Sequence, residues 1–454
     1  MEEGALLIRA ARILDPTQGL DKVGDILVRQ SHIEALGDLD GSSVPPDCRV
    51  VQGQGLVATP GFIDLHAHLR EPGYEEKETI ASGTRAAARG GFTTLCCMPN
   101  TSPPMDTAAV VELVLRKTQA EGTVRVLPIG CVSKGRQGRE LAELAELAQA
   151  GCVAFSDDGS PVADAHLMRL ALTYTLGLSV PVMDHCEEPS LSAGGVMHQG
   201  WVATRLGLRG IPAAAEESIA ARDIALAELT GGRVHLCHVS TAGTVELVRR
   251  AKERGLSITA EATPHHLTLT DAWVEGQQGD GRAPVSPAAY DTAAKVNPPL
   301  RGPEDVAALV EGLREGVIDC IATDHAPHEV TAKLVTFEEA AFGISGLETA
   351  LGLALKLVHG GSLELPVLVE RLTLGPARVL GERFLELVTL RPSTPADITL
   401  FDPGEEWAVD INNFASKGKN TPLEGVTLKG RVRYTIVGGR VVYESKAEAA
   451  QGVA

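Results

Sequence analysis

The segment 61–70, Gly-Phe-Ile-Asp-Leu-His-Ala-His-Leu-Arg, constrains this chain more than any other part of it. With the apolar run at residues 55–60 before it, the segment predicts one buried strand. Because side chains alternate between the two faces of a strand, His66 and His68 point to the same side. Two neutral imidazoles that converge on one point suit a divalent metal such as zinc. The alternative is a pair of core histidines satisfied by hydrogen bonds.

The middle of the chain, residues 59–386, alternates between short apolar strands and helical patterns. Eight segments predict strands: 61–70, 92–97, 124–129, 152–156, 180–184, 234–239, 257–262 and 317–322. Helical patterns lie between them, for example at 139–150, 214–229, 244–254 and 304–315. Eight strand–helix units predict an α/β fold, a (β/α)8 TIM-type barrel. Residues 271–292 predict a long loop before the last strand, of the kind that often covers a site.

The two ends of the chain, residues 1–58 and 387–454, share a texture of short aliphatic strands separated by turns. Gly438-Gly439 predicts a hairpin turn between two strands near the C-terminus. Neither end has enough residues for a core of its own, so we expect both to pair into one small composite β domain, a β-sandwich. Residues 445–454 are expected to be frayed.

Charge and cysteine content exclude several classes of function. The net charge is −18 and no basic cluster is present, which disfavours nucleic acid and anionic membranes as partners. None of the eight cysteines forms a C-x-x-C pair, and most lie in apolar runs, which predicts buried thiols. The N-terminus lacks a signal-peptide pattern and no apolar run could span a bilayer, so we expect a cytoplasmic protein.

Histidine and aspartate recur where the predicted barrel strands end, which is where barrel enzymes place their chemistry. Each residue has an ordinary alternative, because an aspartate can form a turn or helix cap and a histidine can be satisfied in the core. Their coincidence at five strand ends favours a site for one or two divalent ions. Such ions lower the pKa of water and polarise a carbonyl, and a carboxylate can move the proton. The pattern therefore predicts hydrolysis of an amide-like C–N bond.

Eight motifs make the sequence similar to a known family. They occupy residues 64–73, 90–101, 155–159, 184–187, 238–241, 263–266, 295–301 and 322–328. In this order they resemble the dihydroorotase family of the amidohydrolase superfamily, in its larger bacterial type. The resemblance implies a metal-dependent enzyme that reversibly hydrolyses (S)-dihydroorotate to N-carbamoyl-L-aspartate in pyrimidine biosynthesis.

The resemblance also implies a role for individual residues. Asp324 resembles the aspartate that both binds metal and acts as general acid and base. Many amidohydrolases carry a carboxylated lysine at the fourth strand, where this chain has Asp157-Asp158, and Asp158 is the expected bridging ligand. The implied ligands of one or two zinc ions are His66, His68, Asp158, His185, His238 and Asp324.

A second implied set binds the substrate. Arg70 would grip the substrate carboxylate bidentately, with Asn100 and His328 as further partners. Asn297 would meet the ring ureide, and Phe342 and Gly343 would contact the ring through the backbone. Ordinary alternatives are a surface charge for Arg70, a turn for Asn100 and a pre-proline loop for Asn297. We expect His325 to have a supporting role, and also His265 and His266.

Two alternatives stay open at this point. A hydantoinase, dihydropyrimidinase or allantoinase could share the scaffold, although such enzymes typically keep the strand-four lysine and lack the carboxylate grip. A catalytically inactive homologue could serve as a structural partner of aspartate transcarbamoylase, although the expected ligands are all present. The resemblance is compatible with a homodimer or a complex with that transcarbamoylase.

Overall fold

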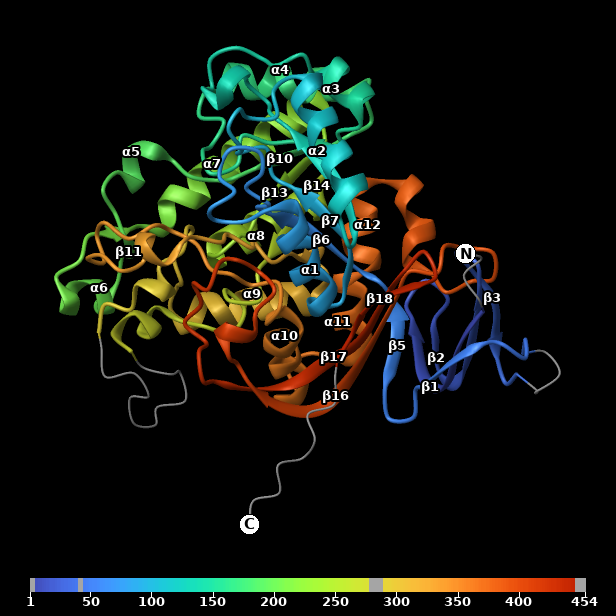
Figure 1. Cartoon of the computed structure of the whole chain (residues 1–454). Helices are drawn as coiled ribbons and strands as arrows, with labels where there is room; N and C mark the ends of the chain where they lie inside the picture. The colour runs from blue at the N-terminus through green and yellow to red at the C-terminus, as the bar shows by residue number, and fades with distance from the viewer. Residues whose placement is uncertain (1–4, 40–43, 277–288, 446–454) are drawn as a thin grey trace.

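The computed structural model describes residues 5–39, 44–276 and 289–445. These residues form a (β/α)8 barrel beside a β-sheet built from both ends of the chain (Figure 1). The predicted fold class is therefore confirmed. Residues 277–288 of the expected loop, and residues 446–454 of the expected frayed end, lie outside the described residues.

Eight parallel strands form the barrel, and neighbours in the chain are neighbours in the sheet. They are β6 (Phe62–Ala67), β7 (Phe92–Cys97), β8 (Arg125–Gly130), β9 (Ala154–Phe155), β10 (Val182–Asp184), β13 (Val234–Leu236), β14 (Ile258–Ala262) and β15 (Cys320–Ile321). Each one overlaps a predicted strand. Asp64 on β6 accepts hydrogen bonds from the backbone N–H of Thr323 (2.9 Å) and of His66 (3.2 Å). This carboxylate therefore links the first strand to the residues that follow the last one.

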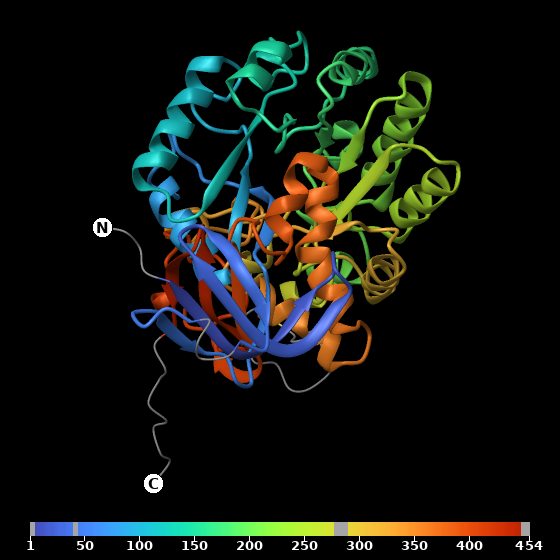
Figure 2. The ribbon, with the colours of Figure 1, turned by 90° about the vertical axis from the view of Figure 1, so that its right-hand side faces the viewer.

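The helices surround the barrel on its outer side (Figure 2). They are α1 (Ile80–Gly90), α2 (Ala108–Glu121), α3 (Leu144–Ala150), α4 (Ala165–Leu176), α7 (Ala213–Thr230), α8 (Ala242–Glu253), α9 (Pro303–Glu315), α10 (Ala350–His359), α11 (Leu365–Leu372) and α12 (Leu374–Leu380). Between β10 and α7 lie α5 (Pro189–Ser192), β11 (Met197–His198), α6 (Trp201–Leu206) and β12 (Gly210–Ile211). The helix expected from residue 139 starts only at Leu144, because Ser133 and Leu141 first form an isolated β-bridge.

The core of the barrel is closed at one end by α12 and the 3-10 segment that follows it. Leu374, Val379 and Leu380 pack in one buried cluster with Ile63 and Leu65 of β6. Burying each such aliphatic side chain contributes roughly 1.5–3 kcal/mol. This buried cluster therefore holds rigid the strands whose ends carry the candidate site residues.

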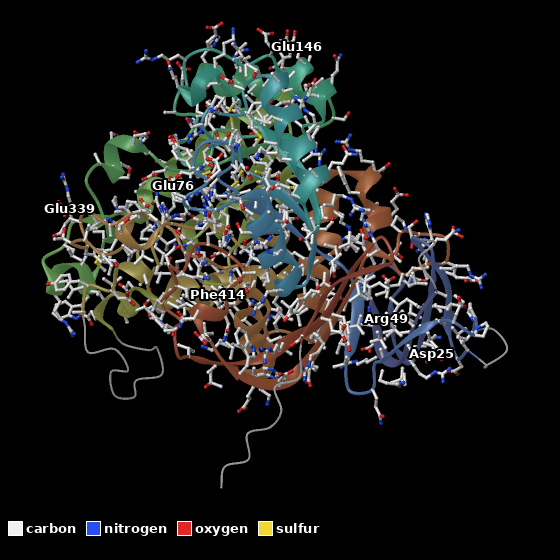
Figure 3. All side chains as sticks on the ribbon, viewed as in Figure 1. Asp25, Arg49, Glu76, Glu146, Glu339 and Phe414 are labelled. Carbon is white, nitrogen blue, oxygen red and sulfur yellow. The ribbon has the colours of Figure 1, made fainter. Side chains whose placement is uncertain are left out.

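The chain ends form one eight-stranded sheet, in which the N-terminal and C-terminal strands lie side by side (Figures 1 and 2). Its strands are β1 (Leu6–Asp15), β2 (Leu20–Arg29), β3 (His32–Gly37), β4 (Arg49–Gln52), β5 (Val57–Pro60), β16 (Ile398–Ala408), β17 (Thr427–Val437) and β18 (Arg440–Glu444). Arg49, labelled in Figure 3, pairs with Glu444 at 2.7 Å and joins the two ends. The predicted hairpin turn at Gly438-Gly439 connects β17 to β18.

The sequence predicts a single strand over residues 55–70, and this prediction is wrong. The segment is divided at Gly61: β5 pairs with β1 and β16 in the terminal sheet, and β6 begins the barrel. A Cβ atom at position 61 would lie 2.1 Å from the Thr93 hydroxyl oxygen, so the crossing between the two sheets requires glycine. The terminal sheet also bonds to the barrel where the Thr399 hydroxyl donates to the Gly91 carbonyl (2.6 Å).

Two expectations from composition can be compared with the described residues. All eight cysteines are free, and seven are buried, whereas Cys48 is only partly buried. Among the described helices, none has both the length and the apolar character that crossing a bilayer demands.

Candidate active site

Six side chains that the sequence singled out as metal ligands converge where the barrel strands end. His66 lies on β6, His68 and His238 lie just beyond β6 and β13, and Asp158, His185 and Asp324 follow β9, β10 and β15. All six are buried. The Asp158 carboxylate lies 3.2 Å from His66 Nε2, 3.5 Å from His68 Nε2 and 3.5 Å from His238 Nε2. Asp324 lies 3.1 Å from His68 Nε2 and 3.6 Å from His66 Nε2.

This donor set fits one or two divalent ions. His66 with Asp158 and His238, and His66 with His68 and Asp324, each bring their donor atoms within 4.8 Å of one another. Within the described part of the chain, His66 Nε2 and Asp158 Oδ1 are buried and form no hydrogen bond. Leaving such atoms buried and unsatisfied costs about 1–3 kcal/mol each, which a shared cation removes. Imidazole and carboxylate donors suit zinc and similar ions.

The second ring nitrogen of three of these histidines is held by an acceptor. His66 Nδ1 lies 2.8 Å from Glu261 Oε1, His68 Nδ1 lies 2.9 Å from Asn100 Oδ1, and His185 Nε2 lies 3.0 Å from Glu187 Oε2. Because a carboxylate or carbonyl oxygen can only accept, each ring carries its proton on that side. In the neutral form of such a ring, the other nitrogen carries a lone pair and faces the cluster, as a metal ligand requires.

Asp157 and Asp158 differ in where they point. Asp157 accepts hydrogen bonds from the backbone N–H of Val132 (3.0 Å) and Ser133 (3.1 Å), and so holds the segment after β8. Asp158 faces the histidines. Burial alone would raise the pKa of Asp158, but the surrounding imidazoles, led by His66, hold this pKa well below its usual range. Asp158 is thus an anion placed among imidazoles.

Three site residues, Arg70, His238 and Asp324, have left-handed backbone angles, with φ of 63°, 35° and 43°. For residues other than glycine such conformations cost on the order of 1–3 kcal/mol each. In each of these three residues this backbone conformation occurs shortly after a barrel strand ends. It turns the side chains of these residues towards a common cavity.

The cavity has a volume of about 230 Å³ and lies beside the candidate metal ligands, which we call the metal cluster. It is lined by the predicted substrate residues Arg70, Asn100, Asn297, His328, Phe342 and Gly343. Arg70 is half-buried, and its Nε donates to the Pro327 carbonyl at 3.3 Å. Within residues 5–39, 44–276 and 289–445, no carboxylate forms an ion pair with it. Burial lowers the pKa of Arg70, although nearby Asp324 and Asp158 oppose this. A guanidinium in this situation is suited to bind an anion.

Other predicted substrate-binding residues already use some of their hydrogen-bonding groups in contacts within the protein. His328 Nε2 donates to the Phe342 carbonyl at 2.8 Å, and its buried Nδ1 has no hydrogen-bond partner among the described residues. Burial, with Arg70 and Lys333 nearby, lowers the pKa of His328 to about 3, so the ring is neutral. The N–H of Gly343 donates to the Lys295 carbonyl (2.9 Å), and its carbonyl accepts from Asn420 (2.9 Å). A backbone contact at this point would therefore use the Phe342 N–H.

Sequence reasoning missed several residues that support the site. Glu261 on β14 accepts from both His66 and His235, at 2.8 Å and 3.0 Å. Burial alone would raise the pKa of Glu261, but these two imidazoles lower it to about 2. Glu78 lies 3.2 Å from His325 Nε2, so His325 points away from the cluster. A charged residue in a short strand of mainly small and apolar residues was the one available signal for Glu261.

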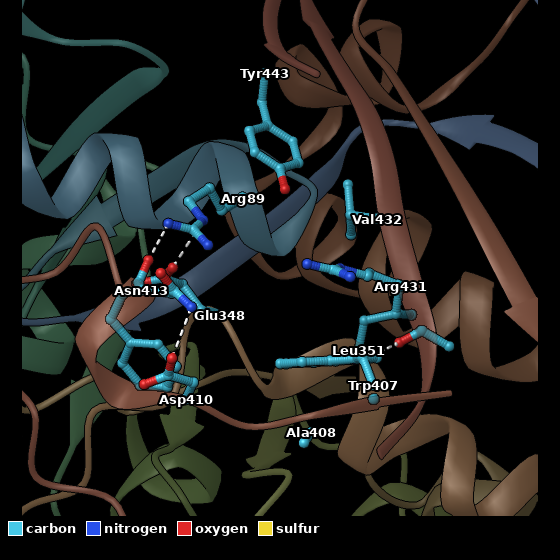
Figure 4. Close-up of a pocket in the computed structure, with 13 residues that line it drawn as sticks. Arg89, Glu348, Leu351, Trp407, Ala408, Asp410, Asn413, Arg431, Val432 and Tyr443 are labelled. Carbon is cyan, nitrogen blue, oxygen red and sulfur yellow. Dashed lines mark hydrogen bonds and ion pairs between the residues drawn. The ribbon is translucent and has the colours of Figure 1, made fainter. Parts of the chain in front are cut away.

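A second cavity, of about 210 Å³, lies between α1, α10 and the terminal sheet (Figure 4) and shares no lining residue with the first. Two of its charged residues form an ion pair with each other: Arg89 Nε lies 3.0 Å from Glu348 Oε2. Glu348 also accepts from the backbone N–H of Ala415 and Ser416, both at 3.1 Å. The metal cluster and the arginine described above belong to the first cavity only.

Two family profiles match this chain. One, described as Dihydro-orotase-like, matches residues 55–244, and one described as Amidohydrolase family matches residues 208–443. The fold, the buried donor set and these matches together define a metal-dependent hydrolase barrel of the amidohydrolase class.

Comparison with individual proteins is more specific. The chain is 48% identical to a dihydroorotase from Geobacter metallireducens and 48% identical to one from Syntrophus aciditrophicus, in each case over 97% of this chain and 99% of the relative. A dihydroorotase from Anaeromyxobacter sp. (strain K) is 50% identical over 97% of this chain and 98% of its own length. This chain belongs to the dihydroorotase family of the amidohydrolases.

Solved structures show the same fold with lower identity. An L-hydantoinase from Arthrobacter aurescens superposes with a TM-score of 0.83 and 25% identity, covering 97% of this chain and 96% of that one. A dihydropyrimidinase from Brevibacillus agri gives a TM-score of 0.82 at 22% identity, over 97% and 95% of the two chains. These likenesses establish the architecture around the site.

Proposed function

We propose that this chain is a dihydroorotase, which reversibly hydrolyses (S)-dihydroorotate to N-carbamoyl-L-aspartate in pyrimidine biosynthesis. The relatives that are 48–50% identical over nearly the whole chain support this reaction. The observation in the structure that carries it is Arg70 beside the His/Asp cluster, a half-buried guanidinium that forms no ion pair with a carboxylate of the described residues. Dihydroorotate is a cyclic ureide that carries a carboxylate, and the guanidinium of Arg70 can bind that carboxylate.

The substrate residues divide the work by chemistry. The two terminal nitrogens of Arg70 bind the carboxylate in a bidentate manner. Asn100 supports this end of the cavity and also fixes His68, while Asn297 meets the ureide. His328 and the backbone at Phe342 and Gly343 complete the wall around the ring.

The proposed cofactor is zinc, as one or two ions held by His66, His68, Asp158, His185, His238 and Asp324. When bound, such ions acidify water and polarise the carbonyl that is attacked. Asp324 accepts a proton on its carboxylate from the attacking water and delivers it to the departing ring nitrogen. Its place 3.1 Å from His68 Nε2, within the cavity, supports this role. In the reverse direction the same carboxylate serves ring closure.

The domain division and assembly are proposals on the same footing. Residues 59–386 are the catalytic barrel, and residues 1–58 with 387–454 are the composite β domain. β5 extends the terminal sheet to Pro60, so the boundary falls within this strand. We further propose a cytoplasmic enzyme that acts as a homodimer or with aspartate transcarbamoylase and binds neither nucleic acid nor membranes.

The test is turnover of dihydroorotate and carbamoyl-aspartate, measured beside hydantoin, dihydrouracil and allantoin. Each assay is run before and after metal stripping and after zinc is restored. Zinc-dependent turnover of the dihydroorotate pair alone is expected. Turnover of an uncharged cyclic ureide in its place would retain the metal centre and reject the role of Arg70. Metal-loaded protein that turns over nothing, with or without aspartate transcarbamoylase, would reject the proposal.

A further inference from the structure

The side-chain amide of Asn297 has a defined orientation in this structure. Its Nδ2 lies 2.9 Å from Glu187 Oε2 and 3.3 Å from His185 Nε2. Because the Glu187 carboxylate can only accept hydrogen bonds, the amide nitrogen of Asn297 must face it. The carbonyl oxygen Oδ1 therefore points away from Glu187. Among the described residues Oδ1 has no hydrogen-bond donor, and Asn297 lines the cavity.

The backbone that carries Asn297 is held independently of Glu187. His266 Nε2 donates to the Pro298 carbonyl at 2.9 Å. The Lys295 carbonyl accepts from Lys333 Nζ (3.1 Å) and from the Gly343 N–H (2.9 Å). With the main chain fixed on both sides, rotation of the Asn297 side chain is the freedom that remains. The hydrogen bond to Glu187 removes this rotational freedom.

We propose that Glu187 is a positioning residue that fixes the Asn297 amide with its oxygen toward the cavity, so that the site selects a ligand with an N–H donor there. The ureide N–H groups of dihydroorotate and of carbamoyl-aspartate supply such a donor. This inference rests on the proposed function and deepens it. Without Glu187 the amide can turn over and present Nδ2, which repels an N–H donor and leaves it unpaired.

Glu187 has a second contact that the test must separate. The same oxygen, Oε2, accepts from His185 Nε2 at 3.0 Å, so loss of Glu187 also frees a predicted metal ligand. An effect through His185 alone would appear as weaker zinc binding. An effect through Asn297 appears as a higher KM at saturating zinc. The two routes are therefore distinguishable by measuring both quantities.

The experiment compares Glu187→Ala, Asn297→Ala and the double variant with wild type, each loaded with zinc. Glu188→Ala is the matched control, since this neighbouring glutamate caps α5 through Ser190 and does not line the cavity. We expect Glu187→Ala to raise KM for dihydroorotate about tenfold, because the N–H donor of the ligand is then left unpaired in the cavity. We expect the double variant to match Asn297→Ala, because Glu187 acts through Asn297. Glu187→Gln should largely restore KM, since its amide oxygen can accept both bonds.

An unchanged KM in Glu187→Ala would overturn the proposal, and so would effects of the two single variants that simply multiply in the double variant. A loss confined to zinc affinity, measured by chelator competition, would assign Glu187 to His185 alone and overturn it too. If Glu187→Ala does not fold, Asn297→Asp tests the same contact: two carboxylates repel, so KM must rise at least tenfold. If the wild-type protein does not turn over dihydroorotate, the proposed function itself is rejected. That result is distinct from a failure of the role proposed for Glu187.

Discussion

Replacement of Arg70 by glutamine is the most informative perturbation of this site. Nε of Arg70 is occupied by the Pro327 carbonyl, so the two terminal nitrogens remain for the substrate carboxylate. Two charge-assisted hydrogen bonds contribute about 1.5–3 kcal/mol each, and glutamine keeps at most one neutral bond of about 1 kcal/mol. The expected loss is about 2–5 kcal/mol, or roughly 30- to 5000-fold in kcat/KM for dihydroorotate.

The assay compares dihydroorotate with dihydrouracil, which has the same ring without the carboxylate. Any turnover of dihydrouracil should change little in Arg70→Gln, and the exposed Arg85→Gln on α1 should leave both unchanged. Because burial lowers the pKa of Arg70, the charge is costly to bury, and the neutral variant should be at least as stable as wild type. Unchanged dihydroorotate kinetics, or an equal loss with dihydrouracil, would refute the carboxylate grip.

Three further predictions concern the groups around the metal cluster. Asp324→Asn should lower kcat by about 1000-fold or more with little change in Tm, and near-native turnover would remove the proposed general acid and base. Glu261→Gln should weaken zinc binding about 10–100-fold in a chelator competition, because the His66 ring loses its carboxylate partner, whereas Glu348→Gln at the second cavity should not. Burial lowers the pKa of His266 from 6.5 to about 4, so the unfolded chain takes up the proton first as pH falls. The fold should therefore lose up to about 3 kcal/mol between pH 6.5 and 4, and His266→Asn should flatten this slope in a Tm titration; identical slopes would contradict it.

The barrel could be predicted from the sequence because its strands are short apolar runs separated by helical patterns. The same regularity places each strand end, and so His66, His185 and Asp324 could be grouped from the order of residues alone. The break at Gly61 could not be seen, because both β5 and β6 are apolar and only their pairing partners differ. Which sheet a strand joins is decided by contacts far away in the chain.

The residues that support the site could not be predicted from local sequence patterns, because they too act through contacts between distant parts of the chain. Glu261 contacts His66 across 195 positions, and Asn297 contacts Glu187 across 110. A sequence pattern shows which residue types are present, but it does not show which hydrogen bonds fix the tautomer of an imidazole or the rotation of an amide. Those choices determine which atom faces the cavity.

The fold alone does not select a substrate for this site. The L-hydantoinase from Arthrobacter aurescens superposes on 97% of this chain with a TM-score of 0.83. It is nevertheless named for a different substrate and is only 25% identical in sequence. The barrel and its His/Asp cluster provide a place for hydrolysis, which many cyclic amides could use. Selection must come from groups beyond the strand ends, whose positions depend on the loops. In the proposed site, Arg70 offers a cation to a carboxylate, and Asn297, held by Glu187, offers an acceptor to an N–H. A ligand that satisfies both carries an anionic group and a ureide on one small ring, which is the chemistry of dihydroorotate.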